Sequence, residues 1–171
     1  MSKIPVFVSC PTNLNEEQNA RRDTIIRIMD DLQLDPRALG RGDYPVNSPL
    51  KEVYSIAKHC SGGIVLGFEQ FYVTAGTVKR GISGQEGKIT TKTAKRFPTP
   101  WNQLEAGILY GLKVPLLIFK ESGIEGGIFG RGSSDIFIQP MPSAQPNESE
   151  MHELKDIFLK WDALVRQKYY D

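Results

Sequence analysis

Short apolar runs alternate with amphipathic stretches along this chain. The runs at 4–8, 64–66 and 114–119 are rich in branched aliphatic residues, which is typical of buried strands. Between them, apolar residues recur at helical spacing over 20–32 and 53–60, which predicts helices with one buried face. This alternation predicts an α/β fold of the flavodoxin-like type. We expect a single doubly wound parallel five-stranded sheet, in the order 2-1-3-4-5, with helices on both faces.

Capping residues indicate where the predicted helices begin and end. Asn15 followed by Gln18 has the spacing of a capping box. Thr99 is suited to cap the next-to-last helix, with Pro100 in its first turn. The glycines at 62–63 are expected to end the helix before the third strand.

The remaining elements have weaker signals. Residues 33–39 predict a second strand, and the Asp-Pro step inside it indicates an irregular edge position. Residues 135–139 predict the last strand, and residues 147–169 predict a C-terminal helix. A length of 171 residues suits one compact unit, so we expect residues 1–171 to form a single domain.

A long segment, residues 69–98, separates the third strand from the helix that follows it. Structureless loops of this length are uncommon, so we expect an inserted basic loop or hairpin in which 71–74 pairs with 88–91. Between residues 70 and 98 the basic residues are Lys79, Arg80, Lys88, Lys92, Lys95 and Arg96, against Glu86 alone. Three roles are open: closing over phosphates, contacting a partner, or remaining a solvated loop. We predict that it is more mobile than the flanking strands.

Composition excludes several classes of protein. The net charge is +1, which gives no overall argument for nucleic acid or for an anionic membrane. No apolar run is long enough to span a bilayer, and the first residues lack a signal-peptide pattern. Two cysteines and two histidines, all widely spaced, indicate neither a disulfide framework nor a metal site. We expect a cytoplasmic protein without a metal.

Candidate site residues follow from the predicted topology. Doubly wound sheets bind ligands beyond the carboxyl ends of their strands, at the point where strand order reverses. Loops after the first three strands, together with the start of the following helix, are therefore expected to form one cleft that holds a phosphorylated nucleoside. The catalytic candidate is Glu105, and the candidate substrate-binding residues are Ser9, Cys10, Arg41, Asp43, Gly67, Glu69 and Trp101.

Trp101 and Glu105 are the most specific pair in the sequence. Their spacing of four places them on one face of a helix. The pattern W-x-x-x-E, followed by a helix and a buried strand, resembles the third helix of Toll/interleukin-1 receptor (TIR) domains. In enzymatic TIR domains this glutamate cleaves NAD at its ribosyl bond.

The TIR resemblance implies a glycohydrolase or cyclase that uses NAD, or a related nucleotide, as substrate rather than cofactor. It also implies a homo-oligomer or a partner defence protein, and a role in bacterial anti-phage defence. Neither a membrane nor a nucleic acid is expected as a partner.

Two other interpretations remain open. The region around Glu105 also looks like nucleoside 2-deoxyribosyltransferase-like proteins. Those proteins usually carry an aspartate before the third strand, where this chain has His59, Cys60 and Ser61. The other alternative is a non-catalytic nucleotide sensor in which Glu105 orients a ribose. Trp101 either stacks on a ring or packs against the sheet, and packing is favoured.

Glu105 would have a specific role in cleaving an N-glycosidic bond. Cleavage of an N-glycosidic bond builds positive charge on the ribose. A carboxylate beside the anomeric carbon stabilises this charge, accepts a ribose hydroxyl, or attacks as a nucleophile. We expect Glu105 at a surface-facing position of its helix.

Overall fold

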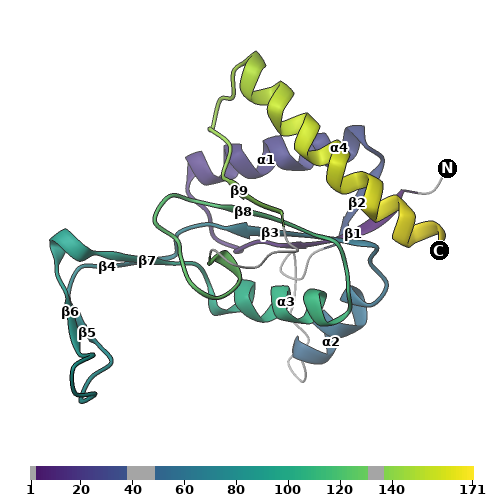
Figure 1. The fold of residues 1–171 in the computed structure, drawn as a ribbon. Coiled ribbons are helices and arrows are strands. Elements are labelled where there is room, and N and C mark those ends of the chain that lie inside the picture. The colour runs from purple at the N-terminus through teal and green to yellow at the C-terminus, as the bar shows by residue number, and fades with distance from the viewer. Residues whose placement is uncertain (1–2, 38–48, 131–136) are drawn as a thin grey trace.

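A five-stranded parallel sheet organises the molecule (Figure 1). The structure is a computed structural model that describes residues 3–37, 49–130 and 137–171. The strand order is β2-β1-β3-β8-β9, and every neighbouring pair is parallel. The predicted order of 2-1-3-4-5 is therefore confirmed. The strands are β1 (Ile4–Ser9), β2 (Leu34–Arg37), β3 (Gly62–Gly67), β8 (Leu116–Lys120) and β9 (Phe137–Pro140).

In the described ranges, four α-helices cover this sheet in two layers. In Figure 1, α1 and α4 lie on one face, and α2 and α3 lie on the other. Their bounds are α1 (Glu16–Asp31), α2 (Pro49–Ala57), α3 (Pro100–Gly111) and α4 (Glu148–Tyr170). None of the helices in the described part of the chain is long and apolar enough to cross a bilayer.

Hydrophobic clusters on both faces of the sheet hold the layers together. On the α1/α4 face, Ile25, Phe158 and Trp161 are fully buried. On the α2/α3 face, Phe7 and Leu109 are fully buried in a second cluster. Each such side chain contributes about 2–3 kcal/mol on leaving water. The helix faces predicted from periodicity therefore supply the core.

The predicted helix starts are confirmed in detail. Asn15 and Gln18 form a capping box at the start of α1. Thr99 caps α3 by accepting from the backbone N–H of Asn102, and a proline occupies the first turn. These contacts satisfy backbone donors that have no partner within the helix.

The glycines at 62–63 do not end a helix, so that prediction is wrong. They begin β3, and α2 ends earlier, at Ala57. A Cβ on Gly62 would lie 2.6 Å from Val165, and one on Gly63 would lie 2.8 Å from Leu116. Glycine is required here because α4 and β8 pack directly against the strand backbone.

Residues 71–97 form a projecting β structure, which we call the arm (Figure 1). β4 (Phe71–Val73) pairs with β7 (Lys95–Phe97), and β5 (Gly76–Val78) pairs with β6 (Gly87–Ile89). The predicted pairing of 71–74 with 88–91 is therefore wrong.

The turn at the tip of the arm explains the pairing. The chain reverses between Val78 and Gly87, which lie opposite each other. Residues before Val78 therefore pair with residues progressively later than Gly87, and Phe71 pairs with Phe97 rather than with 88–91. A short 3₁₀ helix, η1 (Thr91–Thr93), shifts the register between the two pairs of strands.

Candidate active site

Glu105 lies in the second turn of α3, at the carboxyl edge of the sheet. The order of strands reverses between β1 and β3, and Ser9, the last residue of β1, lies opposite Val65 of β3. Glu105 contacts Ser9 at this switch point. Glu105 is only 6% exposed, so the expectation of a surface-facing position is wrong. The face of α3 that carries Glu105 packs against the sheet, as buried Ala106 and Leu109 show.

A chain of hydrogen bonds fixes the Glu105 carboxylate. The Ser9 hydroxyl donates to Glu105 Oε2. Asn102 Nδ2 in turn donates to Ser9 Oγ over 2.9 Å, and Thr99 Oγ1 donates to Asn102 Oδ1 over 3.2 Å. The Ser9 proton points to Glu105 because the hydroxyl oxygen accepts from Asn102. The helix cap is thereby connected to the carboxylate.

Asn102 is a site residue that the sequence interpretation missed. It is 1% exposed and lies one helical turn before Glu105. Its position three residues before Glu105 was the available signal, since i and i+3 share a helix face.

Burial sets the protonation of Glu105. Removal from water raises the pKa of Glu105 from its ordinary 4.5 to about 7, and the hydrogen bond from Ser9 acts in the opposite direction. Near neutral pH the group therefore populates both the protonated and the ionised form. A carboxyl group with a pKa near 7, in a sheet edge suited to ligands, is a candidate for catalysis.

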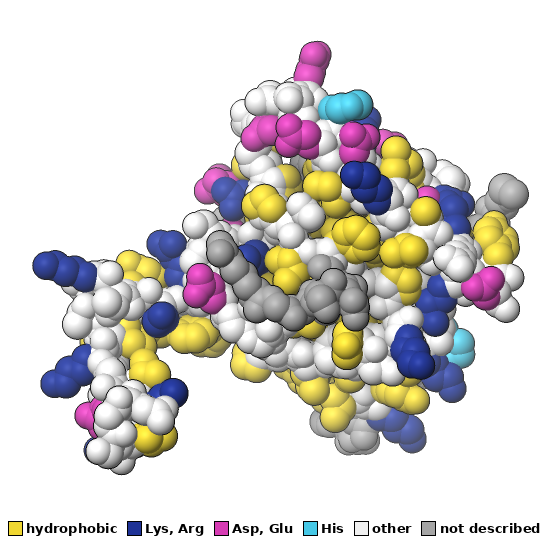
Figure 2. All heavy atoms as spheres, viewed as in Figure 1, with side chains coloured by type: hydrophobic (Ala, Val, Ile, Leu, Met, Phe, Trp, Pro, Cys, Tyr) yellow, Lys and Arg dark blue, Asp and Glu magenta, His cyan; other side chains and the backbone are white. Residues whose placement is uncertain are grey.

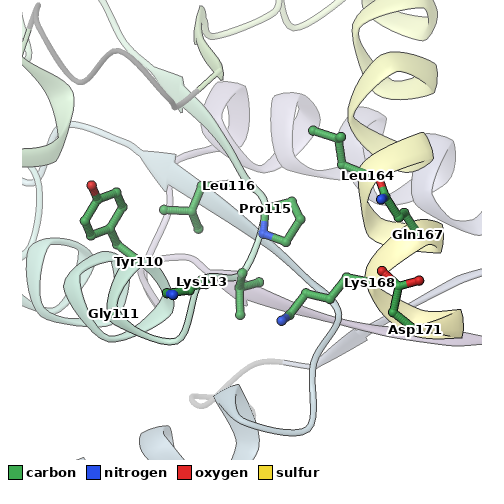
Figure 3. A pocket seen from close by; sticks show the side chains of 10 residues that line it. Tyr110, Gly111, Lys113, Pro115, Leu116, Leu164, Gln167, Lys168 and Asp171 are labelled. Atoms are coloured by element: carbon green, nitrogen blue, oxygen red, sulfur yellow. The ribbon is translucent and has the colours of Figure 1, made fainter.

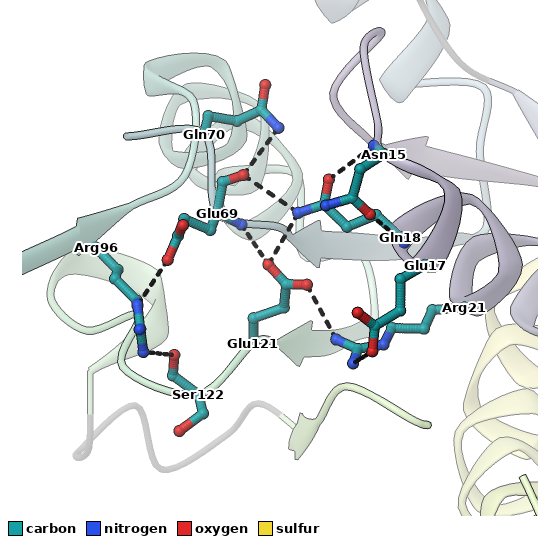
Figure 4. A network of polar contacts seen from close by, with 9 residues as sticks. All are labelled: Asn15, Glu17, Gln18, Arg21, Glu69, Gln70, Arg96, Glu121 and Ser122. Atoms are coloured by element: carbon teal, nitrogen blue, oxygen red, sulfur yellow. Dashed lines mark hydrogen bonds and ion pairs between the residues drawn. The ribbon is translucent and has the colours of Figure 1, made fainter. Parts of the chain in front are cut away.

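A second carboxylate cluster lies beyond the ends of β3 and β8 (Figure 4). The Glu121 carboxylate accepts from Gln18 Nε2 over 3.1 Å, from Arg21 Nη1 over 3.0 Å and from the backbone N–H of Glu69 over 2.6 Å. The Glu69 carboxylate pairs with Arg96 Nε over 2.7 Å. We call these five residues the Glu121 network. It connects α1, the end of β8 and the base of the arm.

The network changes the interpretation of Glu69. This residue was expected to bind substrate, and here its carboxylate anchors Arg96 of β7 to the body. Glu121 directly follows β8, so the rule on strand ends was the signal for it. Gln18, Arg21 and Arg96 carried no such signal, because only the folded chain brings them beside a carboxylate.

Gly67 and Trp101 are engaged in packing. A Cβ on Gly67 would lie 2.5 Å from the ring of Phe129, so glycine lets this ring cover the end of β3. Trp101 is partly buried against the cluster between the sheet and the α2/α3 layer. This is the packing role that the sequence interpretation favoured.

The other candidates have separate surroundings. Cys10 is partly buried, packs against the α1/α4 cluster and contacts the carbonyl of Pro11 over 3.5 Å. Arg41 and Asp43 lie outside the described residues. Among the candidates that the structure describes, Ser9 and Glu105 are joined directly by a side-chain hydrogen bond.

Two large surface depressions lie away from Glu105. One, of about 810 Å³, lies between the ends of α3 and α4 (Figure 3), where Tyr110, Leu116 and Lys168 contribute to its lining. It opens at the amino edge, because Leu116 begins β8. The other, of about 730 Å³, lies at the carboxyl ends of β8 and β9, beside Lys120 and Glu121. Within the described ranges, no group of three histidine, cysteine or acidic residues could hold a metal ion.

The comparisons with known proteins show the fold. No protein-family model matches the sequence, and no curated protein matches it. Among solved structures, the chain is similar to the CMP N-glycosidase BcmB of Clostridium botulinum. The two share 13% sequence identity with a TM-score of 0.51, and the match covers 91% of this chain and 98% of the other. The α/β class is thereby supported, and membership of the TIR family stays a prediction.

Proposed function

We propose that this chain cleaves the N-glycosidic bond of a nucleotide, with Glu105 as the catalytic carboxylate. The observation that carries the proposal is a buried carboxyl group with a pKa of about 7, hydrogen-bonded to Ser9 at the switch point of the sheet. The similarity to a structure named as a CMP N-glycosidase supports the same chemistry.

The proposed reaction uses the ionised form of Glu105. The Ser9 proton points to Oε2, so Oε1 is the oxygen proposed to face the anomeric carbon. A bond forms between Oε1 and that carbon as the bond to the base nitrogen breaks, and the electron pair leaves with the base. Water then attacks the same carbon and releases the carboxylate and the sugar. The water supplies a hydroxyl to the sugar and a proton to the base or to solvent.

Ser9 and Asn102 are proposed as positioning residues. Asn102 bonds to the Ser9 hydroxyl, which leaves the hydroxyl proton available only to Glu105. This arrangement favours the ionised carboxylate and fixes its orientation before substrate arrives. A preorganised anion is most effective when the ribose becomes cationic.

The substrate is proposed to be NAD or a related nucleotide. NAD and CMP share a ribosyl N-glycosidic bond, and the nicotinamide of NAD leaves as a neutral molecule without needing an acid. A role in anti-phage defence is what the TIR resemblance implies and stays a prediction. Cleavage of either substrate requires a carboxylate beside the anomeric carbon of the ribose.

A base-release assay tests the proposal. Purified protein is incubated separately with NAD, with CMP and with deoxynucleosides plus a second free base, and the products are identified by chromatography. Release of nicotinamide or cytosine supports the proposal. Exchange of bases between deoxynucleosides indicates a transferase instead. Saturable binding of a nucleotide without turnover indicates a sensor and overturns the enzymatic proposal.

The pH profile of the same assay tests the protonation state. Because the ionised carboxylate is proposed to react, kcat/KM should rise as pH increases through about 7. A profile that falls through this range would mean that Glu105 acts as an acid, and the proposed role would be wrong.

A further inference from the structure

The arm projects from the body and points away from the start of α4 (Figure 1). Its base is fixed by Arg96, which pairs with Glu69 and lies 5.3 Å from the centre of the Tyr72 ring. The arm consists of two pairs of three-residue strands, and Tyr72 and Arg96 belong to one of them, β4 with β7. An isolated two-stranded structure is marginally stable in water without a covering surface.

Apolar side chains are exposed along the whole arm. Five of them have between 41 and 54% of their surface exposed: Phe71, Tyr72, Val78, Ile82 and Phe97. Five such side chains are many for a segment of this size, and the strands β6 and β7 carry Lys88, Lys95 and Arg96. Exposed apolar and aromatic side chains that gather on one segment are typical of a contact site for a protein.

The charge of the arm is opposite to that of the body. Residues 71–97 contain six lysines and arginines and one glutamate, a net charge of +5. The whole chain has a net charge of +1, so the rest of the chain has a net charge of −4. Figure 2 shows basic side chains on the arm and acidic side chains gathered over the upper end of the body, where α4 begins.

A groove with matching properties lies beside the first turns of α4. We call this hollow of about 510 Å³ the α4 groove. Met141, Pro142 and Ile157 give it apolar lining, and the carboxylates of Glu150 and Glu153 add negative charge. Arg21 also lines it, and its guanidinium is paired with Glu17 and Glu121. The α4 groove thus offers apolar contacts with acidic neighbours, and the arm offers apolar side chains with basic neighbours.

We propose that the arm of one copy docks in the α4 groove of a second copy, and that the second copy returns the contact. The occupant is another molecule of this chain because the complementary surface is on the chain itself. The arm and the start of α4 lie apart in Figure 1, so an exchange between copies engages both without rearranging the body. A reciprocal exchange has the two-fold symmetry that is commonest among homo-oligomers.

Charge reversal tests the docking directly. The arm variant is Lys79→Glu/Arg80→Glu/Lys88→Glu. The groove variant is Glu150→Gln/Glu153→Lys, in which glutamine keeps the capping box that Glu150 forms with Asn147. Sedimentation velocity on wild type should show self-association that rises with concentration. Each variant alone should weaken association by about tenfold or more.

A mixture of the two variants should associate again. The acidic arm of the arm variant meets the basic groove of the groove variant, and the native arm of the groove variant meets the native groove of the arm variant. The control is Lys51→Glu/Lys58→Glu/Lys160→Glu, which changes the charge as much as the arm variant at exposed positions outside the arm. It should associate as wild type does. Melting temperatures establish that all variants are folded.

Three results would overturn the proposal. One is a wild type that stays monomeric at its highest soluble concentration. Another is a mixture of variants that stays monomeric after each variant alone has lost association. The last is a monomeric wild type that binds single-stranded oligonucleotides through the arm, which would identify the arm as a nucleic-acid surface instead.

Discussion

Glu105 and Glu121 lie at the carboxyl edge of the same sheet, yet their side chains have very different surroundings. The Glu105 carboxylate is buried and accepts from the hydroxyl of Ser9, a neutral donor. The Glu121 carboxylate accepts from the Arg21 guanidinium, from the Gln18 amide and from a backbone N–H. Glu121 therefore has a cation that compensates its charge.

This difference indicates which carboxylate is suited to chemistry. A charge that is compensated in the folded protein stabilises structure and gains little from a cationic transition state. A charge that is buried among neutral groups is costly in the free protein and becomes favourable when positive charge develops beside it. The Glu121 network has the properties of a structural connection, and Glu105 has those of a catalytic group.

The largest effect is expected from Glu105→Gln. The substitution keeps the volume and the hydrogen bond from Ser9 while removing the negative charge. We expect kcat for base release to fall by about 100-fold or more, with KM changed by only about threefold. The matched control is Glu121→Gln, which should keep turnover within about threefold of wild type. Equal losses in the two variants would remove the distinction between these carboxylates.

Stability should depend on pH through Glu105. Below pH 4.5 the carboxyl is protonated in both the folded and the unfolded state, so it costs nothing. As pH rises from 4.5 to about 7, the unfolded state releases this proton while the folded state still holds it, so the folded protein loses about 3 kcal/mol of stability, and the loss is complete above about pH 7. Glu105→Gln lacks this loss. Its melting temperature should therefore be higher than that of wild type at pH 8 and equal to that of wild type near pH 4. A difference in melting temperature between wild type and Glu105→Gln that stays the same at every pH would contradict the raised pKa.

Glu121→Ala should mainly affect stability. It leaves Arg21, Gln18 and the Glu69 N–H without their shared acceptor. We expect a loss of about 2 kcal/mol, because the site is partly exposed and water replaces some of these bonds. For a chain of this size, this corresponds to a melting temperature lower by about 4–8 °C. A differential scanning calorimetry trace that matches wild type would show that the network contributes nothing.

The smallest effect is expected from Ser9→Ala. Loss of the hydroxyl removes the hydrogen bond that lowers the pKa of Glu105, so this pKa should rise further. At pH 7 we expect kcat/KM to fall by about tenfold, with recovery toward the wild-type value as pH increases. A loss that is equal at every pH would mean that Ser9 acts by a route other than the ionisation of Glu105.

Local sequence patterns accounted for much of the fold. Apolar runs and helical periodicity gave the five sheet strands, and the right-handed crossover rule gave their order. The caps at Asn15 and Thr99 were equally local, since they satisfy donors within one turn. The position of Glu105 near the switch point followed from the same topology.

The tertiary structure decided what the local patterns left open. Gly62 and Gly63 read as helix breakers, and only the approach of α4 and β8 shows why they begin a strand. The burial of Glu105 depends on how α3 is turned against β1 and β3, which a four-residue spacing does not specify. Asn102 and the Glu121 network depend on contacts between residues about 50 to 100 positions apart. Sequence periodicity fixes which residues share a face, whereas the charge and protonation of a site depend on which faces meet.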